Sequence, residues 1–320
     1  MSLLGIDLGG TKLATAVFSE EAELLRQECL PLEKRSGAAV GALLTAQVSK
    51  LLQEQLQQGD PVSAIGACVP GISNRKDSTV WAPNIPGWEN YPLAAEIMAV
   101  APGIPVAIDS DRTCYIMGEA WKGAAQGCTD AIFIGVGTGI GMGIMADSHF
   151  LRGSNDAAGA IGWMTMERSW LPKYRQCGHF ETLASGDGIA KVARELLSAD
   201  VSYNGVLRNN AGERLNAAAV FAAYEQEDPL ARRIIAECIV WWGMAVANLV
   251  SIFNPEKIIM GGGVFGPAIP LIPAIYEEAS KWGQPLSMNS VEIVPSQLGA
   301  MAGCWGAGWL ALQAIKAAND

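Results

Sequence analysis

The stretch Leu3-Leu4-Gly5-Ile6-Asp7-Leu8-Gly9-Gly10-Thr11-Lys12 ends an apolar run with a carboxylate and follows it at once with two glycines. Glycine permits positive φ and close backbone approach, so successive N–H groups can converge on phosphate oxygens. A neighbouring carboxylate suits the cation that accompanies phosphate, directly or through water. Residues 13–18 contain β-branched and aromatic side chains and predict a second strand. The stretch therefore predicts a phosphate-binding β-hairpin with Asp7 near the metal.

A similar pattern recurs later in the chain. Residues 131–145 repeat an apolar run, the turn Gly137-Thr138-Gly139 and a second apolar run. Neither hairpin has the GxxxxGK[ST] spacing of a P-loop or a GxGxxG turn that leads into a helix. A single glycine turn can serve backbone geometry alone. Two such turns favour one phosphate-binding hairpin in each half of the chain.

Length and charge limit the possible functions. A chain of 320 residues exceeds the size at which single cores stop growing, so two lobes are expected. The formal net charge is -10, and basic residues form only isolated pairs such as Lys34-Arg35. A nucleic-acid-binding surface is therefore not expected. An anionic ligand has to be held by backbone N–H groups and a metal ion.

Cysteine usage and hydropathy predict a cytoplasmic protein without a membrane segment. The seven cysteines are scattered, odd in number and without a CxxC pair, which is typical of reduced thiols. The chain enters a strand within three residues of Met1 and shows no signal-peptide pattern. The longest uncharged run, residues 238–255, contains Asn248 and Asn254 and is interpreted as a buried helix.

Strand-like and helix-like segments alternate along the chain and predict an α/β layer architecture. The pattern at residues 64–71 predicts a buried strand that runs into a turn at Gly71. The pattern at residues 257–260 predicts a strand followed by the turn Gly261-Gly262-Gly263. Helices are expected at residues 38–58, from Asp187, at 217–226 after Asn216, at 229–253 after Asp228 and at about 300–317.

Two polar clusters lie between the hairpins. Residues 81–88 place Asn84 between prolines and tryptophans, and aromatic faces with a few hydrogen-bonding groups suit a sugar. The run Ile108-Asp109-Ser110-Asp111 ends a strand with two carboxylates, either of which could serve as a general base for a substrate hydroxyl. Spacing alone does not choose between Asp109 and Asp111. Asn84 could also be an ordinary turn residue, and Asp7 could merely cap a turn.

In order along the chain, these motifs resemble those of ROK-family sugar kinases. Residues 7–12 resemble the first phosphate motif, Pro83-Asn84 with Gly87-Trp88 the sugar loop, and Ser110-Asp111 with Gly118-Glu119 the segment around the catalytic aspartate. Residues 137–141 resemble the second phosphate motif, and residues 261–263 the nucleoside-binding turn. Counted back from Glu119, the family pattern selects Asp111 as the base.

The chain departs from the family pattern at its zinc motif. Where the family has Glu-x-Gly-His, this chain has Ala160 and Trp163 at the Glu and His positions. The cysteine-rich zinc loop is reduced to Cys177 and His179, too few for a four-ligand site, so no zinc is expected. A stoichiometric zinc signal in chelator-washed protein would contradict this. Trp163 either packs into the vacated volume or turns its ring to the sugar. Glu181 still matches the sugar-contacting Glu.

The resemblance implies two ribonuclease-H-like lobes of the actin/hexokinase type with a central cleft. The expected lobes are residues 1–112, joined by a C-terminal helix at about 300–318, and residues 113–299. The implied reaction is ATP- and Mg²⁺-dependent phosphorylation of a hexose, most simply at its 6-hydroxyl, by a homodimer. Alternatives are an amino sugar or another hexose as acceptor, polyphosphate as donor, or a non-catalytic regulator, although regulators of the family carry an N-terminal helix-turn-helix segment that has no room before Gly5.

The resemblance also implies a role for each site residue. Asp111 would be the base and would contact the sugar together with Gly71, Asn84, Trp163 and Glu181, while Asp7 would hold Mg²⁺. The nucleotide and its phosphates would be held by Asp7, Gly9, Gly10, Thr11, Lys12, Gly137, Thr138, Gly139, Gly261, Gly262 and Gly263.

Overall fold

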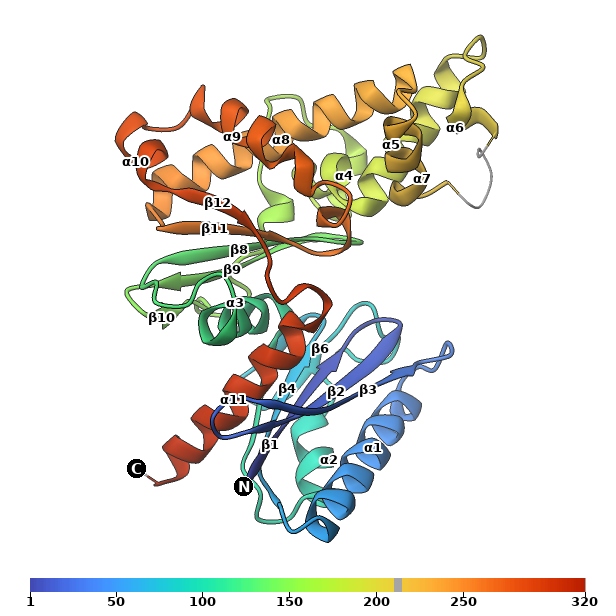
Figure 1. Ribbon diagram of the computed structural model, residues 1–320. Helices are drawn as coiled ribbons and strands as arrows, with labels where there is room; N and C mark the ends of the chain where they lie inside the picture. Colours follow the sequence, from blue (N-terminus) through green and yellow to red (C-terminus); the bar gives the residue numbers. More distant parts are fainter. Residues whose placement is uncertain (210–214, 320) are drawn as a thin grey trace. The chain divides into compact units, whose positions relative to one another are not determined.

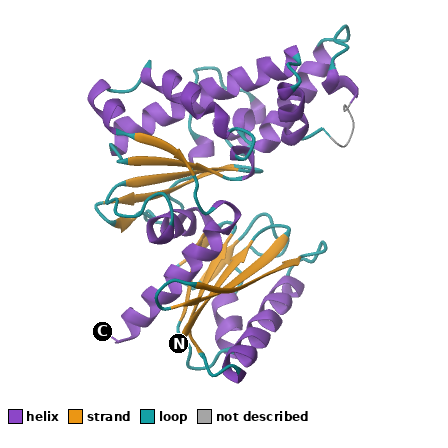
Figure 2. Cartoon of the chain, viewed as in Figure 1, coloured by secondary structure: helices purple, strands orange, loops and turns teal. Residues whose placement is uncertain are grey.

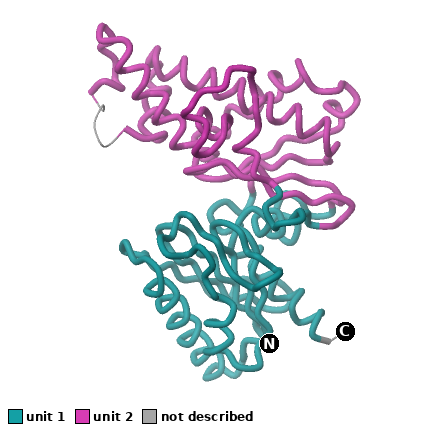
Figure 3. Tube along the Cα trace, turned by 180° about the vertical axis from the view of Figure 1, so that it is seen from behind, with its two compact units in different colours: residues 1–127, 150–158, 297–320 teal, residues 128–149, 159–296 magenta. Residues whose placement is uncertain are grey.

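The computed structural model describes residues 1–209 and 215–319, which form two compact units (Figure 1). Unit 1 comprises Met1–Gly127, Phe150–Ala158 and Gln297–Asp320, and unit 2 comprises Cys128–His149 and Gly159–Ser296. The chain therefore passes from one unit to the other at residues 127/128, 149/150, 158/159 and 296/297 (Figure 3). Neither unit is one continuous segment.

Unit 1 is built on a sheet with the strand order β3-β2-β1-β4-β7. Its strands are β1 (Ser2–Leu8), β2 (Lys12–Ser19), β3 (Leu24–Pro31), β4 (Val62–Val69) and β7 (Val106–Ser110), and a separate ribbon pairs β5 (Ile72–Asn74) with β6 (Thr79–Trp81). β1 pairs antiparallel with β2 and parallel with β4, and β4 pairs parallel with β7. The first predicted hairpin is confirmed.

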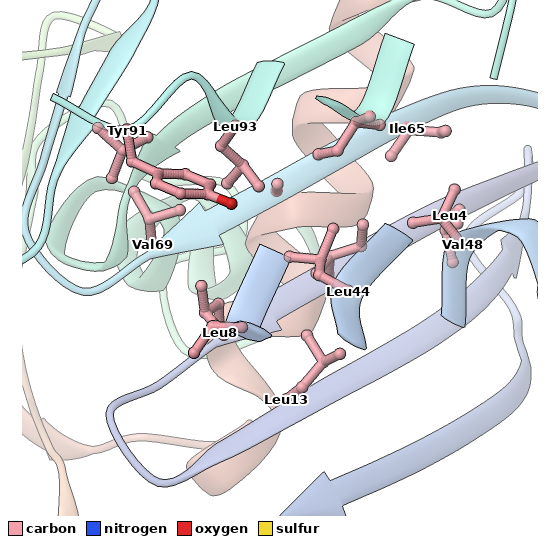
Figure 4. Packing of buried hydrophobic residues seen from close by; sticks show 14 of the residues in the cluster. Leu4, Leu8, Leu13, Leu44, Val48, Ile65, Val69, Tyr91 and Leu93 are labelled. Carbon is pink, nitrogen blue, oxygen red and sulfur yellow. The ribbon is translucent and has the colours of Figure 1, made fainter. Parts of the chain in front are cut away.

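Helices cover both faces of this sheet. On one face lie α1 (Ala38–Gln57) and α2 (Leu93–Val100), and on the other α3 (Asp111–Lys122) and α11 (Ala302–Asn319). Because side chains alternate along a strand, Leu4 of β1 joins the core under α1, whereas Leu3 packs with Cys304 of α11. Figure 4 shows the α1 side, where Leu44 and Val48 meet the leucines of β1 and β2. The predicted helix at residues 38–58 is confirmed.

Glycines let α11 approach the sheet and α3 closely. A Cβ at Gly66 of β4 would overlap the carbonyl oxygen of Ala307, and one at Gly5 of β1 would lie 2.6 Å from the carbonyl oxygen of Cys304. Gly118 of α3 lies against α11 in the same way. This packing explains why all of α3 belongs to unit 1, so that the first segment of the unit ends at residue 127 instead of the expected residue 112.

The sheet of unit 2 has the order β10-β9-β8-β11-β12, and its strands β9, β8, β11 and β12 repeat the directions of β2, β1, β4 and β7. Its strands are β8 (Ala131–Val136), β9 (Ile140–Ala146), β10 (His149–Phe150), β11 (Lys257–Gly261) and β12 (Glu292–Pro295). Its helices, which gather on one side of the sheet (Figure 2), are α4 (His179–Ala184), α5 (Gly186–Ala199), α6 (Val206–Asn209), α7 (Ala217–Glu225), α8 (Pro229–Phe253), α9 (Ile272–Ser280) and α10 (Pro285–Ser290). The second predicted hairpin is confirmed.

Helix caps in unit 2 agree with the sequence in two of three cases. Asn216 and Asp228 accept backbone N–H groups at the starts of α7 and α8, as predicted. The expected start at Asp187 is wrong, because Ser185 caps α5 by accepting the N–H of Gly188 at 3.0 Å. By length and composition α8 could cross a membrane. It packs as a core helix, however, with Trp242 buried and its indole N–H donated to the carbonyl of Ala184.

Candidate functional site

Three neighbouring strands of unit 1 bring polar side chains into one row. The registers pair Asp7 of β1 with Cys68 of β4, and Cys68 with Asp109 of β7. Burial raises the pKa of Asp7, while the Cys68 thiol and the charge of Lys12 lower it. A Cβ at Gly303 of α11 would overlap the Asp7 carboxylate, so this glycine makes room for it.

Asp111 is the first residue of α3, directly after the end of β7. The extended conformation of Ser110 sets the start of the helix, and the Asp111 carboxylate accepts the N–H of Arg112 at 2.8 Å. Burial raises the pKa of Asp111 to about 6, and the charge of Asp7 adds to this, while Arg112 opposes it. The group is thus ionised at neutral pH and basic enough to take up a proton.

The structure distinguishes Asp109 from Asp111. Asp109 is only 5% exposed, accepts the N–H of Ser110 at 2.8 Å and forms an ion pair with Arg152 at 2.5 Å. In the described ranges Asp111 has no ion pair within 4.0 Å. The geometry therefore supports Asp111 over Asp109 as the reactive carboxylate, and the role of base stays a prediction.

The predicted sugar loop packs against the first hairpin. Asn84 is exposed, and a Cβ at Gly10 would lie 3.3 Å from its Cβ. Two hydrogen bonds fix the loop: Gly37 donates its N–H to Pro86 at 2.8 Å, and Trp88 donates its indole N–H to Gly37 at 3.0 Å. The structure thus brings Asn84 and the Gly9-Gly10 turn together, as a sugar beside a phosphate requires.

Two residues of this region serve the fold. Trp88 is 1% exposed and stacks on Tyr91 at 4.1 Å between ring centroids, so its ring is a core element and cannot face a sugar. Gly71 has φ +151°, and a Cβ there would overlap the carbonyl oxygen of Trp81. The Gly71 carbonyl oxygen accepts a hydrogen bond from Nη2 of Arg112 at 3.5 Å. Gly71 thereby supports the neighbour of Asp111, and its contact with the sugar stays a prediction.

In unit 2 the second hairpin and Glu181 form one cluster. Gly137 donates its N–H to the carbonyl of Gly139 at 2.9 Å, and the Glu181 carboxylate accepts the N–H of Ile140 at 2.7 Å. A Cβ at Gly139 would lie 2.6 Å from Oε2 of Glu181. Burial raises the pKa of Glu181, and the Ile140 N–H opposes this. The predicted phosphate turn and the predicted sugar-contacting Glu are therefore direct neighbours.

A cavity of about 320 Å³ opens beside this hairpin, and we call it the Gly137 cavity. Residues that line it include Gly137, Thr138, Asp187, Asn216, Phe221 and Gly263. Of the predicted glycine trio only Gly263 lines it, because the Phe133 ring covers Gly261 and Gly262 packs on the backbone of Val136 with φ +86°. Sequence reasoning missed Phe221 and saw Asn216 only as a helix cap.

Comparison with known proteins establishes the family. Residues 3–314 match the model of the ROK family. The chain belongs to the ROK family. It is 32% identical to a glucokinase of Halalkalibacterium halodurans over 317 residues, which cover 97% of this chain and 94% of the relative.

Solved ROK structures share the fold of this chain. The ROK family glucokinase from Streptomyces griseus, in complex with glucose and AMPPNP, superposes with a TM-score of 0.79 at 29% identity and covers 98% of this chain and 100% of its own. A ROK family transcriptional regulator, described as a homolog of the E. coli MLC protein, superposes with a TM-score of 0.84 at 25% identity. The match covers 98% of this chain and 78% of the regulator. The fold is thus that of ROK sugar kinases, with two α/β units.

At the altered ROK zinc motif, the structure corrects one expectation. The packing interpretation of Trp163 is wrong, since the side chain is 57% exposed and lines a second cavity of unit 2. The thiol of Cys177 lies 3.3 Å from the hydroxyl of Thr182. Among the described residues no group of three or more His, Cys, Asp or Glu could hold a metal ion. The absence of zinc stays a prediction.

Proposed function

We propose that this ROK-family sugar kinase transfers the γ-phosphoryl group of ATP to the 6-hydroxyl of a hexose, with Asp111 as general base. Kinase activity as such follows from the glucokinases that the chain resembles along nearly its whole length. One observation carries the finer proposal: Asp111 begins α3 with a pKa of about 6, which the nearby charge of Asp7, at the end of β1 in the first hairpin, helps to raise.

In this proposal unit 1 holds the acceptor and moves its proton. Asn84, beside Gly10, orients the sugar ring, and the Asp111 carboxylate accepts the proton of the 6-hydroxyl. The freed oxygen forms a bond to the γ-phosphorus while the bond from that phosphorus to the bridging oxygen of ADP breaks. Such a transfer depends mainly on alignment and charge neutralisation, so a positioned base and converging backbone N–H groups are sufficient protein chemistry.

The residues present in unit 1 fit a magnesium ion. Burial raises the pKa of both Asp7 and Asp111 at this sheet end, and the charge of Asp7 raises the pKa of Asp111 further. A divalent cation near Asp7 would relieve this, and Mg²⁺ prefers carboxylates, phosphates and water as ligands. When bound, it would neutralise the phosphate oxygens. Asp7 would hold it, directly or through water.

Unit 2 has a suitable site for the nucleotide. The Gly137 cavity combines the aromatic ring of Phe221 with the polar side chains of Asn216 and Asp187. It also includes the N-terminus of α5, where Gly186 donates its N–H to Gly137 at 2.7 Å. A nucleoside needs an apolar wall with a few polar groups, and phosphates are stabilised near helix N-termini. Glu181 would orient the sugar, and Gly9, Thr11, Lys12, Thr138 and Gly139 would contact phosphates.

A second candidate acceptor, an amino sugar or another hexose, is favoured by Ala160 and the exposed Trp163. These residues replace the family's sugar-contacting Glu and its zinc-holding His, so the pocket differs on that side of the ring. A non-catalytic sugar-binding protein is less consistent with the chain, because Asp7, Asp111 and the Gly-Thr-Gly turn are all kept. A cytoplasmic homodimer remains part of the proposal.

A direct assay tests the proposal. Purified protein is incubated with Mg²⁺, a panel of hexoses and amino hexoses, and either ATP or polyphosphate, and the sugar phosphate formed is identified. We expect ATP-dependent formation of a 6-phosphate. A folded protein that phosphorylates none of these sugars with ATP would refute the proposal, and faster turnover with polyphosphate would change the donor.

The pH dependence of turnover tests the base. Because Asp111 must be ionised, kcat/KM is expected to fall below about pH 6 instead of near the ordinary carboxyl value. Arg112 holds the Asp111 pKa down, so Arg112→Ala should move this acid limb to higher pH. Arg35→Ala, which removes an exposed arginine that pairs with Glu33, should leave the limb in place. An unmoved limb in Arg112→Ala would argue against Asp111 as the titrating group.

A further inference from the structure

The second cavity of unit 2 shares no residue with the Gly137 cavity. It has a volume of about 320 Å³, and we call it the Trp163 cavity. Its lining includes Trp163, Glu167, Arg168, Trp170, Arg175 and His179. None of the phosphate-turn residues and neither Asn216 nor Glu181 is part of this lining. It therefore needs an explanation of its own.

The lining contains a buried imidazole with a nitrogen that lacks a hydrogen-bond partner. His179 is 5% exposed, and its Nδ1 accepts the N–H of Met166 at 3.4 Å, which places the proton of the neutral ring on Nε2. Burial lowers the pKa of His179 and so favours this neutral form. Within the described residues Nε2 has no hydrogen-bond partner, and Oε1 of Glu167 lies 3.8 Å away.

A buried donor without an acceptor is costly, so a ligand oxygen at this position would gain stabilisation. Nε2–H as donor and the Glu167 carboxylate as acceptor are side by side, an arrangement that suits the hydroxyl groups of a sugar, each of which both donates and accepts. Tyr174 and Trp241 pack edge-on against the imidazole at 4.5 and 5.5 Å and fix its orientation. The donor is thus preorganised.

Two tryptophans in the lining expose large apolar surfaces. Trp163 is 57% exposed and Trp170 is 65% exposed, whereas Trp242 is buried in the core of the same unit. Aromatic faces combined with a few polar groups are typical of small-molecule sites and suit the apolar face of a sugar ring.

The charged residues in the lining favour an anion. Arg168 and Arg175 outnumber the single carboxylate of Glu167, and burial lowers the pKa of the His179 imidazole although the charge of Glu167 opposes this. In the described part of the chain neither arginine forms an ion pair, whereas the neighbouring Lys173 is bound to Glu195 at 2.8 Å. A guanidinium matches the oxygens of a phosphate group through two parallel hydrogen bonds.

We propose that the Trp163 cavity is a second ligand site that binds a sugar phosphate. The tryptophans contact the sugar ring, the arginines bind the phosphate, and Nε2–H of His179 donates to a ring hydroxyl. The lining of this site comes from unit 2 alone and shares only Trp163 with the sugar contacts that the family pattern predicts, so the proposal does not depend on Asp111 or on the transfer reaction. A sugar phosphate is nevertheless the class of molecule that the proposed reaction would produce.

Titration of the full chain with hexose 6-phosphate, with the parent hexose and with inorganic phosphate tests this site. Binding is followed by calorimetry and by tryptophan fluorescence. At the Trp163 cavity, followed as the fluorescence quenching that Trp170→Ala removes, we expect saturable binding of the sugar phosphate and at least 10-fold weaker binding of either fragment. Trp170→Ala should remove most of the quenching, and the double variant Arg168→Ala/Arg175→Ala should weaken binding at least 10-fold. Trp282→Ala, which removes a tryptophan 64% exposed outside the cavity, should preserve both.

The substituted side chains are exposed, so thermal melting should show that all variants fold like the parent. The site is refuted if no probe binds saturably or if the arginine variant binds as tightly as the parent. Inorganic phosphate binding as tightly as the sugar phosphate would refute the sugar part. Parallel kinase assays keep the two proposals apart: loss of all turnover with intact sugar phosphate binding counts against the transfer reaction alone.

Discussion

Asp111→Asn is expected to lower kcat about 100- to 10,000-fold, the usual contribution of a general base, while sugar binding stays measurable. The amide keeps the size of the side chain and can still accept a hydrogen bond, but it cannot take up the proton of the hydroxyl. Steady-state turnover together with calorimetric sugar binding measures both parts. Retention of kcat within 10-fold of the parent would refute the assignment of Asp111 as the base.

Stability should change in the opposite direction. Because burial raises the folded-state pKa of Asp111 to about 6, the fold favours the protonated form, and stability falls as pH rises through the folded pKa. Above that pH the neutral amide avoids this cost, so Asp111→Asn should melt at least as high as the parent at pH 7.5, with a gain on the order of 1 kcal/mol. At pH 5 the difference should shrink.

Asp109→Asn is the matched control two residues away. It removes the charge that pairs with the partly buried Arg152, so it should lower the melting temperature while having the smaller effect on kcat. If Asp109→Asn abolished turnover and Asp111→Asn did not, the roles of the two carboxylates would be reversed.

Gly66→Ala is expected to be the most destabilising single-methyl change in unit 1. The added Cβ would overlap the carbonyl oxygen of Ala307 and lie 2.9 Å from the backbone nitrogen of Ala311. Both are main-chain atoms of α11 and cannot rotate away, so the helix has to shift from the sheet. We expect a loss of about 3 kcal/mol or more, at the upper end of overpacking effects, seen as a clear drop in melting temperature.

Gly266→Ala provides the control for this change. Its added Cβ would meet only the Gly263 carbonyl oxygen at 3.7 Å, an ordinary contact, and Gly266 has φ -88°. Its melting temperature should stay within a few degrees of the parent. If Gly66→Ala were equally harmless, α11 would not be held as closely to β4 as the structure has it.

The sequence was sufficient for features that depend on neighbouring residues. Both hairpins, α1 and the caps at Asn216 and Asp228 follow from local periodicity and turn chemistry. The carboxylates at strand ends were also visible, because a strand that stops at a polar pair is a local pattern. The ROK pattern then placed the motifs in order, and residues 3–314 match that family.

Features that depend on tertiary packing were not predictable in the same way. The sequence places Trp88 and Trp163 each directly after a glycine, yet Trp88 is buried on Tyr91 and Trp163 is exposed, because only the folded loop decides which ring has a partner. Phe221 reaches the Gly137 cavity from a helix far along the chain from that turn. The predicted start of α5 was wrong for a local reason. Ser185 and Asp187 are both good N-cap residues, and in the structure Ser185 is the one that caps the helix.

The four passages of the chain between the units have a consequence for synthesis. The apolar face of the first sheet that contains Leu3, Phe18 and Ala64 is covered by α11, which a ribosome makes only after all of unit 2. During translation of residues 128–296, α3 is the only native helix available to that face, and the larger part that α11 covers stays open. Unit 2 can complete its own sheet before α11 is made, so unit 1, whose first segment is synthesised first, would be the last to finish folding. Nascent chains should therefore depend on holding chaperones during this interval.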